Sequence, residues 1–516
     1  CEALQKVATN DGEGSMCLFC EDAPQSSGPE HLRITQRSAG ASRRLFLKSA
    51  GLAAAVGASI VTTPSLAQTT PADPDLARLK SSSRILFKGG LILSMDRAVG
   101  DFVEGDVLIE NGRIRQVAAS ISVDAQSTMV VDSKNRIVLP GFVDTHHHFY
   151  QGLLRSILTN GLLNPDYNRT INGPITGAYL PSDVHTGSLI SALGMIDMGT
   201  TLSVDTSQCS HTPEHTDAGI AALRESGMRV VYAYWTGQGQ GVQFPQDSAR
   251  LRKSYFNSED QLLTLALGST LDVRNFTYAR ENGLRVVSHG VDKAREPRLH
   301  ELAKAGLLKA GDELIHCNDL SEEAWRIIRD AGIKVSLSPA IEMTMGHGMP
   351  GIQGALDHGL RPSLSSDVDA TMAQDPFTLM RTTMTLQRAL VLQRERAGEK
   401  NLPPLLTCRD VLEFATIEGA RCAGLDHRVG SLTPGKEADI VLLRTDMINV
   451  WPINNAPGAV VNVMNPGHVE SVFIAGKPRK WRGRLVDVDE RRLLQAAADA
   501  RTAVLKRCNF PIDLLG

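Results

Sequence analysis

The sequence predicts an α/β protein in which a distorted (β/α)8 TIM-type barrel carries a small β-sandwich built from both ends of the mature chain. Two patterns lead to this fold class. In the middle of the chain, apolar strand-like runs alternate with helical patterns, as βαβ units around a parallel sheet do. Short alternating strands broken by turn residues flank that region on both sides. The eight candidate barrel strands are residues 137–145, 200–205, 229–234, 263–267, 284–288, 313–316, 334–338 and 361–366.

The flanking segments set the predicted domain boundaries. The first contains Asn111-Gly112 between two alternating runs, which is a hairpin signal, and the second begins after Gly430. The five predicted segments are a signal-bearing extension (1–67), the first part of the sandwich (68–138), the barrel (139–428), the second part of the sandwich (429–487) and a C-terminal helical tail (488–516).

The composition is that of an ordinary globular protein. The chain has 516 residues, 42% of them hydrophobic, and a formal net charge of -3. No basic run is long enough to indicate nucleic-acid binding, so we expect no nucleic-acid partner.

The extension contains an export pattern. Arg43-Arg44 precedes a short apolar run at residues 50–61, and Ser65-Leu66-Ala67 offers a small-residue cleavage site. This pattern resembles a twin-arginine signal, so we expect the twin-arginine export machinery as a partner and a periplasmic or secreted location. An uncleaved membrane anchor is the alternative. The roles of residues 1–15 and of Cys17-x-x-Cys20 stay open, and the sequence does not decide between a monomer and a homo-oligomer.

A strand that ends in alternating histidines is half of a metal site. In Pro140-Gly141-Phe142-Val143-Asp144-Thr145-His146-His147-His148, an extended backbone places His146 and His148 on one side and His147 on the other. Three further strand-like runs end in His289, His316 and Asp367. Because barrel enzymes carry their sites at the carboxyl ends of the strands, we expect these side chains to converge on a metal. The alternative is that they are buried core residues with satisfied hydrogen bonds.

With these residues in place, the chain resembles the amidohydrolase superfamily and, within it, the branch of atrazine chlorohydrolase and cytosine deaminase. The resemblance covers about residues 85–487. The matching pieces are residues 140–148, Gly152-Leu153-Leu154-Arg155, Gly199-Thr200-Thr201, His289, His316, Asp367 and residues 432–441.

The resemblance implies one catalytic divalent metal ion, zinc before iron, held by His146, His148, His289 and Asp367. Metal-bound water ionises near neutral pH and would attack an sp2 carbon of a cyclic or aromatic C–N substrate, in a deaminase- or chlorohydrolase-like reaction. Asp367 would accept the proton of that water. His316 would orient the water or polarise the substrate, or else serve as a further ligand. Relatives with two metals carry a bridging lysine that residues 264–269 lack, so we expect a single ion.

One position departs from the pattern. Deaminases of this branch have glutamate three residues after the third metal-binding histidine, where this chain has Asp292. Aspartate supports the same acid chemistry but reaches about one methylene less, so a hydrolase that opens cyclic amides stays an alternative. A non-catalytic periplasmic binding protein is the second alternative.

Small-molecule sites combine apolar walls with a few polar groups. The residues predicted to bind a small-molecule substrate are Tyr150, Gln151, Trp235 and His316.

Overall fold

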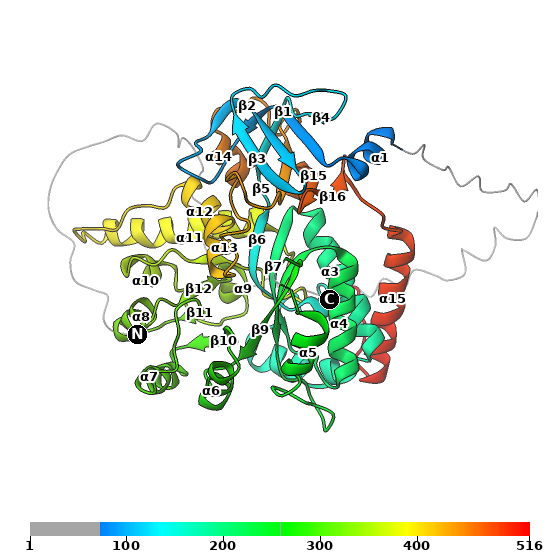
Figure 1. Cartoon of the computed structure of the whole chain (residues 1–516). Coiled ribbons are helices and arrows are strands. Elements are labelled where there is room, and N and C mark those ends of the chain that lie inside the picture. The colour runs from blue at the N-terminus through cyan, green and yellow to red at the C-terminus, as the bar shows by residue number, and fades with distance from the viewer. Residues whose placement is uncertain (1–72, 259, 516) are drawn as a thin grey trace, which may run out of the picture. The chain divides into compact units, whose positions relative to one another are not determined.

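The computed structural model describes residues 73–258 and 260–515 (Figure 1). The predicted signal segment, with Arg43-Arg44 and Cys17-x-x-Cys20, lies outside the described residues. In the part of the chain that is described, no helix has the length and apolar character needed to cross a membrane.

The middle of the chain forms a parallel sheet of eight strands in sequential order, as predicted. An isolated parallel bridge joins His147 in the first strand to Asp367 after the last, so the barrel is nearly closed. The strands are β6 (Phe142–His147), β7 (Thr200–Ser207), β8 (Arg229–Tyr234), β9 (Leu263–Ser269), β10 (Val286–Asp292), β11 (Glu313–Asn318), β12 (Lys334–Leu337) and β13 (Ser363–Leu364). The predicted fold class is confirmed.

Helices cover the outer face of the barrel (Figure 1). Several begin with proline in the first turn, where a missing N–H costs nothing. The helices between and after the barrel strands are α3 (Pro181–Asp197), α4 (Pro213–Ser226), α5 (Ser248–Tyr255), α6 (Val273–Glu281), α7 (Glu296–Lys304), α8 (Glu322–Asp330), α9 (Pro339–Thr344), α10 (Ile352–Asp357), α11 (Pro376–Arg396), α12 (Cys408–Phe414) and α13 (Ile417–Cys422). Of these, α9 carries Glu342, which contacts His316 at the carboxyl end of the barrel, and α13 packs against β6, β12 and β13. The segment after β6 forms short turns instead: η1 (Phe149–Leu154), η2 (Leu163–Tyr167), α2 (Asn168–Thr170) and η3 (Ile171–Ile175).

A second sheet of nine strands combines both ends of the described chain. β14, from the C-terminal part, pairs antiparallel with β5, from the N-terminal part. The predicted hairpin is present, with Asn111 and Gly112 at φ 50° and 76°. The strands are β1 (Arg84–Ile92), β2 (Phe102–Glu110), β3 (Arg113–Ala118), β4 (Met129–Asp132), β5 (Arg136–Pro140), β14 (Ile440–Arg444), β15 (Val469–Ile474), β16 (Lys477–Trp481) and β17 (Arg484–Leu485). The remaining elements are α1 (Pro74–Ser81), α14 (Ala456–Gly458), η4 (Ala459–Val463), η5 (Pro466–His468) and α15 (Glu490–Arg507), which packs on α3.

The apolar run at residues 137–145 is two strands and not the single one that the sequence suggests. β5 belongs to the nine-stranded sheet and β6 to the barrel, and Gly141 lies between them. A Cβ at Gly141 would lie 2.1 Å from Thr201 Oγ1. The chain therefore passes from one sheet to the other where only glycine fits, and β6 then delivers His146 and His148 to the barrel's carboxyl end.

Candidate metal centre

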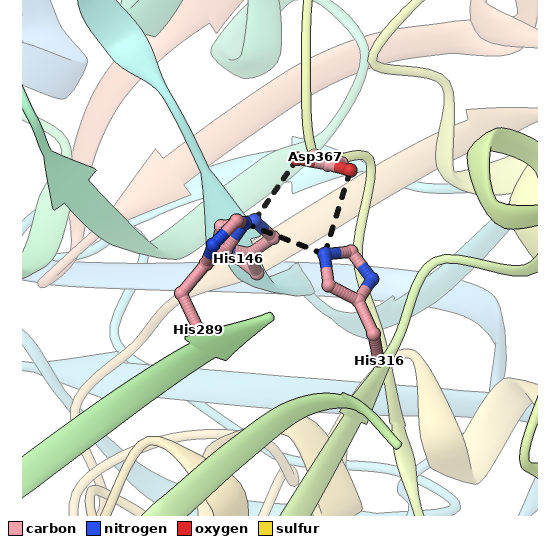
Figure 2. A group of neighbouring side chains, drawn as sticks. All are labelled: His146, His289, His316 and Asp367. Atoms are coloured by element: carbon pink, nitrogen blue, oxygen red, sulfur yellow. Dashed lines mark hydrogen bonds and ion pairs between the residues drawn. The ribbon is translucent and has the colours of Figure 1, made fainter. Parts of the chain in front are cut away.

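Three histidines and one aspartate converge at the carboxyl end of the barrel. Figure 2 shows the side chains of His146, His289, His316 and Asp367 pointing toward one another. One nitrogen or oxygen atom from each lies within 4.8 Å of the others. The histidines come from β6, β10 and β11, and Asp367 lies three residues beyond β13, which are the strand ends that the sequence indicated.

The backbone at this centre is unusual in two places. His316 has φ 78° and Asp367 has φ 63°. Positive φ is rare for residues with a Cβ, and such positions cluster at functional sites. Both side chains reach the centre from this conformation.

Contacts to β7 fix the orientation of the β6 histidines. His148 Nδ1 donates to the Thr206 carbonyl at 3.0 Å, which leaves its Nε2 as the acceptor nitrogen. His146 Nδ1 lies 2.8 Å from Thr206 Oγ1. The Nε2 atoms of His146 and His148 lie 3.0 and 3.5 Å from Asp367 Oδ1. Outer contacts of this kind orient metal-binding histidines in general. His148 therefore lies beside the group of four, with its free nitrogen toward the same carboxylate.

A buried glutamate holds His316. His316 Nδ1 donates to Glu342 Oε1 at 3.0 Å, and the Ser338 N–H donates to the same oxygen at 2.8 Å. His316 Nε2 lies 3.4 Å from His289 Nε2 and 3.7 Å from Asp367 Oδ2. Glu342 lies in α9, five residues after β12, and does not end a strand-like run, so no sequence pattern selects it.

The electrostatics of the centre favour a divalent cation. Burial lowers the pKa of His146 to about 3 and the pKa of His289 well below its usual value, so both imidazoles are neutral at pH 7. Burial raises the pKa of Asp367, but His146, His148 and His316 outweigh it, and the net pKa is well below the usual value. Neutral imidazoles with one carboxylate are a donor set that suits zinc. The residues thus fit the metal that the sequence implies.

His147 lies on the other side of β6, away from the metal centre. Its Nδ1 lies 3.0 Å from Ser366 Oγ, and its Nε2 lies 3.1 Å from Ser191 Oγ and 3.4 Å from Asp369 Oδ2. The alternation along the strand therefore separates His147 from its two neighbours in the way that strand geometry requires.

A cavity of about 450 Å³ opens onto the centre. His148, His289, His316 and Asp367 contribute to its inner wall. Its outer wall includes three asparagines at i, i+4 and i+8, joined by hydrogen bonds of 2.6 and 2.9 Å between their side-chain amides: Asn164, Asn168 and Asn172. The cavity is therefore polar at its mouth as well as at its base.

Asp292 lines this cavity, at the end of β10. Its carboxylate forms an ion pair with the Arg295 guanidinium and accepts the Arg295 backbone N–H at 2.9 Å. The side chain is 28% exposed. Asp292 thus faces the cavity while its carboxylate is ion-paired with Arg295.

Of the residues predicted to bind substrate, only His316 is among those that line the cavity in the described part of the chain. Tyr150 and Gln151 lie in η1 beneath the wall, where the Gln151 amide donates to the hydroxyl of Tyr167 at 2.6 Å. Trp235 is buried, with its ring centroid 6.0 Å from that of His289. Tyr167 takes the position at the wall that the sequence assigned to Tyr150 and Gln151. The reason is that η1 turns these two side chains inward under the segment at 163–172.

A family model described as the amidohydrolase family matches residues 137–479. The chain belongs to the amidohydrolase family. This amidohydrolase is 25% identical over 431 residues to a 5-methylthioadenosine/S-adenosylhomocysteine deaminase of Caldicellulosiruptor saccharolyticus, covering 80% of this chain and 96% of the relative. It is also 25% identical to a 5'-deoxyadenosine deaminase of Methanosarcina mazei, covering 82% of this chain and 99% of the relative.

Solved structures share the fold of this amidohydrolase. An adenosine deaminase from Xanthomonas campestris with bound zinc superposes with a TM-score of 0.72 at 20% identity, covering 82% of this chain and 98% of the other. Atrazine chlorohydrolase TrzN from Arthrobacter aurescens, complexed with zinc, has a TM-score of 0.72 at 20% identity, covering 81% and 100%. The predictions of the family and of a hydrolase acting on carbon–nitrogen bonds are confirmed.

Proposed function

We propose that this amidohydrolase binds one zinc ion and removes an amino group, or a related leaving group, from a ring carbon of a nitrogen heterocycle. The convergence of His146, His289, His316 and Asp367 within 4.8 Å carries the proposal. The two curated relatives described above are deaminases of adenine-containing compounds, which supports deamination as the reaction and a nucleoside-sized substrate. A cavity of about 450 Å³ is within the range typical of small-molecule sites.

His146, His148, His289 and Asp367 would hold the ion. His316 is either a further ligand or a group that orients the reactants, since its Nε2 faces both His289 and Asp367. A divalent ion bound there would supply a Lewis acid and make water ionisable near neutral pH.

The side chains around the ion divide the proton transfers between them. Asp367 Oδ1 contacts the β6 histidines, while Oδ2 faces His316. Asp367 would accept the proton of the attacking water. Asp292 lies in the cavity wall, where Arg295 orients its carboxylate, and would pass to the substrate a proton that it first takes up from solvent.

A substrate panel tests the reaction. Zinc-loaded protein would be incubated with 5'-deoxyadenosine, S-adenosylhomocysteine, atrazine and the cyclic amide dihydrouracil, with Asp367→Ala as the matched control. We expect ammonia release from an adenine compound by the wild type and none by the control. If atrazine were the only compound turned over, with release of chloride, the reaction would be displacement of halide and not deamination. Ring opening of dihydrouracil alone would contradict the deaminase proposal in favour of a cyclic amidase.

We also propose that the protein is exported folded by the twin-arginine machinery and acts in the periplasm. The pattern from Arg43 to Ala67 supports this. Replacing Arg43-Arg44 with two lysines should retain the precursor in the cytoplasm, and the exported protein should begin at or near Gln68. An exported protein that keeps residues 45–67 would contradict cleavage.

A further inference from the structure

A histidine outside the proposed ligand set also lines the cavity. His347 lies in the loop after α9 and shares the cavity wall with His316 and Asp292. Its ring packs edge-on against His316, with the centroids 4.9 Å apart and the planes at 80°. We propose that His347 binds the substrate directly, with its imidazole hydrogen-bonded to the heterocycle beside the reacting carbon. This inference rests on the proposed function and names one residue that selects the substrate.

The polar atoms of His347 carry the argument. Its Nε2 is buried and has no hydrogen-bond partner among the described residues. A buried nitrogen without a hydrogen-bond partner is unfavourable, so such atoms are rare unless a ligand or water completes them. A neutral imidazole offers one donor and one acceptor. A nitrogen heterocycle presents the matching groups at its edge.

Hydrogen bonds and two glycines define the backbone path of residues 346–349, on both sides of His347. Gly346 and Gly348 flank it with φ 68° and 127°, conformations that residues with a Cβ rarely adopt. The His347 N–H donates to the Glu342 carbonyl at 2.9 Å. The Asp319 carboxylate accepts the Met349 N–H at 3.3 Å, and a Cβ on Gly348 would lie 2.3 Å from Asp319 Oδ2. The same loop thus connects His347 to Glu342, which orients His316.

His347 and Asp292 have different parts in this scheme. The Asp292 carboxylate is engaged by Arg295 and is assigned to proton transfer. His347 is assigned to recognition, so its loss should weaken binding more than it slows the chemical step. The two residues can therefore be separated by experiment.

The first test needs no substrate. A crystal structure of the zinc-loaded wild type, at a resolution that shows ordered water, should place a cavity water within about 3.2 Å of His347 Nε2. A protein atom bonded to Nε2 would overturn the inference, because the nitrogen would then be unavailable to a ligand. This outcome is independent of whether any compound in the panel is turned over.

The second test uses zinc-loaded protein and 5'-deoxyinosine, the deamination product, which has no amino group left to remove. Calorimetry with this compound should show a Kd that rises about 5- to 100-fold in His347→Phe, which keeps an aromatic ring but removes both nitrogens. His347→Gln, which keeps a donor and an acceptor, should recover part of the affinity. His300→Phe is the matched control, because His300 is a partly exposed histidine on α7 that does not line the cavity.

Turnover separates this inference from the proposed function. With 5'-deoxyadenosine as the substrate of the zinc-loaded protein, His347→Phe should raise KM and lower kcat by less than about 10-fold, and its zinc content should equal that of the wild type. An unchanged Kd and KM in His347→Phe would overturn the inference while leaving the proposed function standing. If the wild type neither binds nor deaminates any adenine compound, the proposed function fails and the crystallographic test alone decides whether His347 faces a ligand site.

Discussion

A buried arginine joins the barrel to the nine-stranded sheet, and its replacement should strongly destabilise the protein. Arg229, the first residue of β8, is fully buried. Its Nε and Nη2 donate to the Asp439 carboxylate at 2.9 and 3.0 Å, and Nη2 donates to Glu437 Oε2 at 2.6 Å. Arg229→Met fills the space of the aliphatic stem but leaves two carboxylates without this cation.

The size of the expected loss in stability depends on the hydrogen-bond and ion-pair partners that Glu437 and Asp439 keep in Arg229→Met. Removal of one partner from a buried ion pair costs about 3–5 kcal/mol. Glu437 retains Arg428 at 2.6 Å, and Asp439 retains the Ala475 N–H at 2.8 Å. We therefore expect Arg229→Met to lower the free energy of unfolding by about 3–4 kcal/mol, toward the lower end of that range.

Urea unfolding followed by circular dichroism, at fixed zinc concentration, measures this loss. The double variant Arg229→Met/Asp439→Asn should be more stable than the sum of the two single changes predicts, by at least about 1 kcal/mol, because the residues are in contact. Arg394→Met is the control. Arg394 pairs with Glu399 at the surface, so Arg394→Met should leave the urea midpoint close to that of the wild type. A loss below 1 kcal/mol in Arg229→Met, or simple additivity in the double variant, would refute the reasoning.

Three further predictions concern the site and the pH response. Asp292→Asn should retain zinc and lower kcat by roughly 10²- to 10⁴-fold; wild-type kcat in steady-state assays would remove Asp292 from the reaction. Glu342→Gln should weaken zinc binding about 10-fold or more in a chelator competition, because it removes the charged partner of His316; unchanged affinity would argue that His316 is not a ligand. Burial raises the pKa of Glu437, but Arg428 and Arg229 outweigh it, so its folded pKa is below 4.5. Its stabilising contribution is therefore complete at neutral pH and is lost as pH falls below 4.5 and through the folded pKa. Between pH 7 and 3, urea midpoints should fall less in Glu437→Gln than in the wild type, and parallel curves would contradict this assignment.

Much of the fold could be predicted because barrel strands are buried on both faces and so read as short apolar runs. The break between two strands at Gly141 could not be predicted, because the apolar run continues through this residue. Only the structure shows that Thr201 packs too close to Gly141 for any side chain to fit there. The extension of β10 to Asp292 was also missed. Gly290 adopts φ 69°, and the pairing of β10 with β11 shifts register between Ser288 and Val291. The hydrophobic pattern of the sequence does not predict such an irregularity.

The metal centre could be predicted from the same apolar runs that predicted the strands. Each proposed ligand closes an apolar run, so its type and position carried the signal. The cavity wall had no such pattern, because residues 163–175 form the helical turns η2, α2 and η3 and do not end a barrel strand. His347 and Glu342 lie in the connection after β12, and only the three-dimensional path of that connection brings them to His316. The ligand assignments, the segment boundaries and the export route stay predictions.

The metal content of the purified protein tests the central claim most directly. Elemental analysis of active wild type, together with His146→Ala and Asp367→Ala, would be combined with the ammonia-release assay. The proposed centre predicts about one equivalent of zinc in the wild type, and loss of both zinc and activity in the two folded variants. Active protein without metal, or two tightly bound equivalents in the wild type, would contradict a hydrolase built on a single ion at this centre.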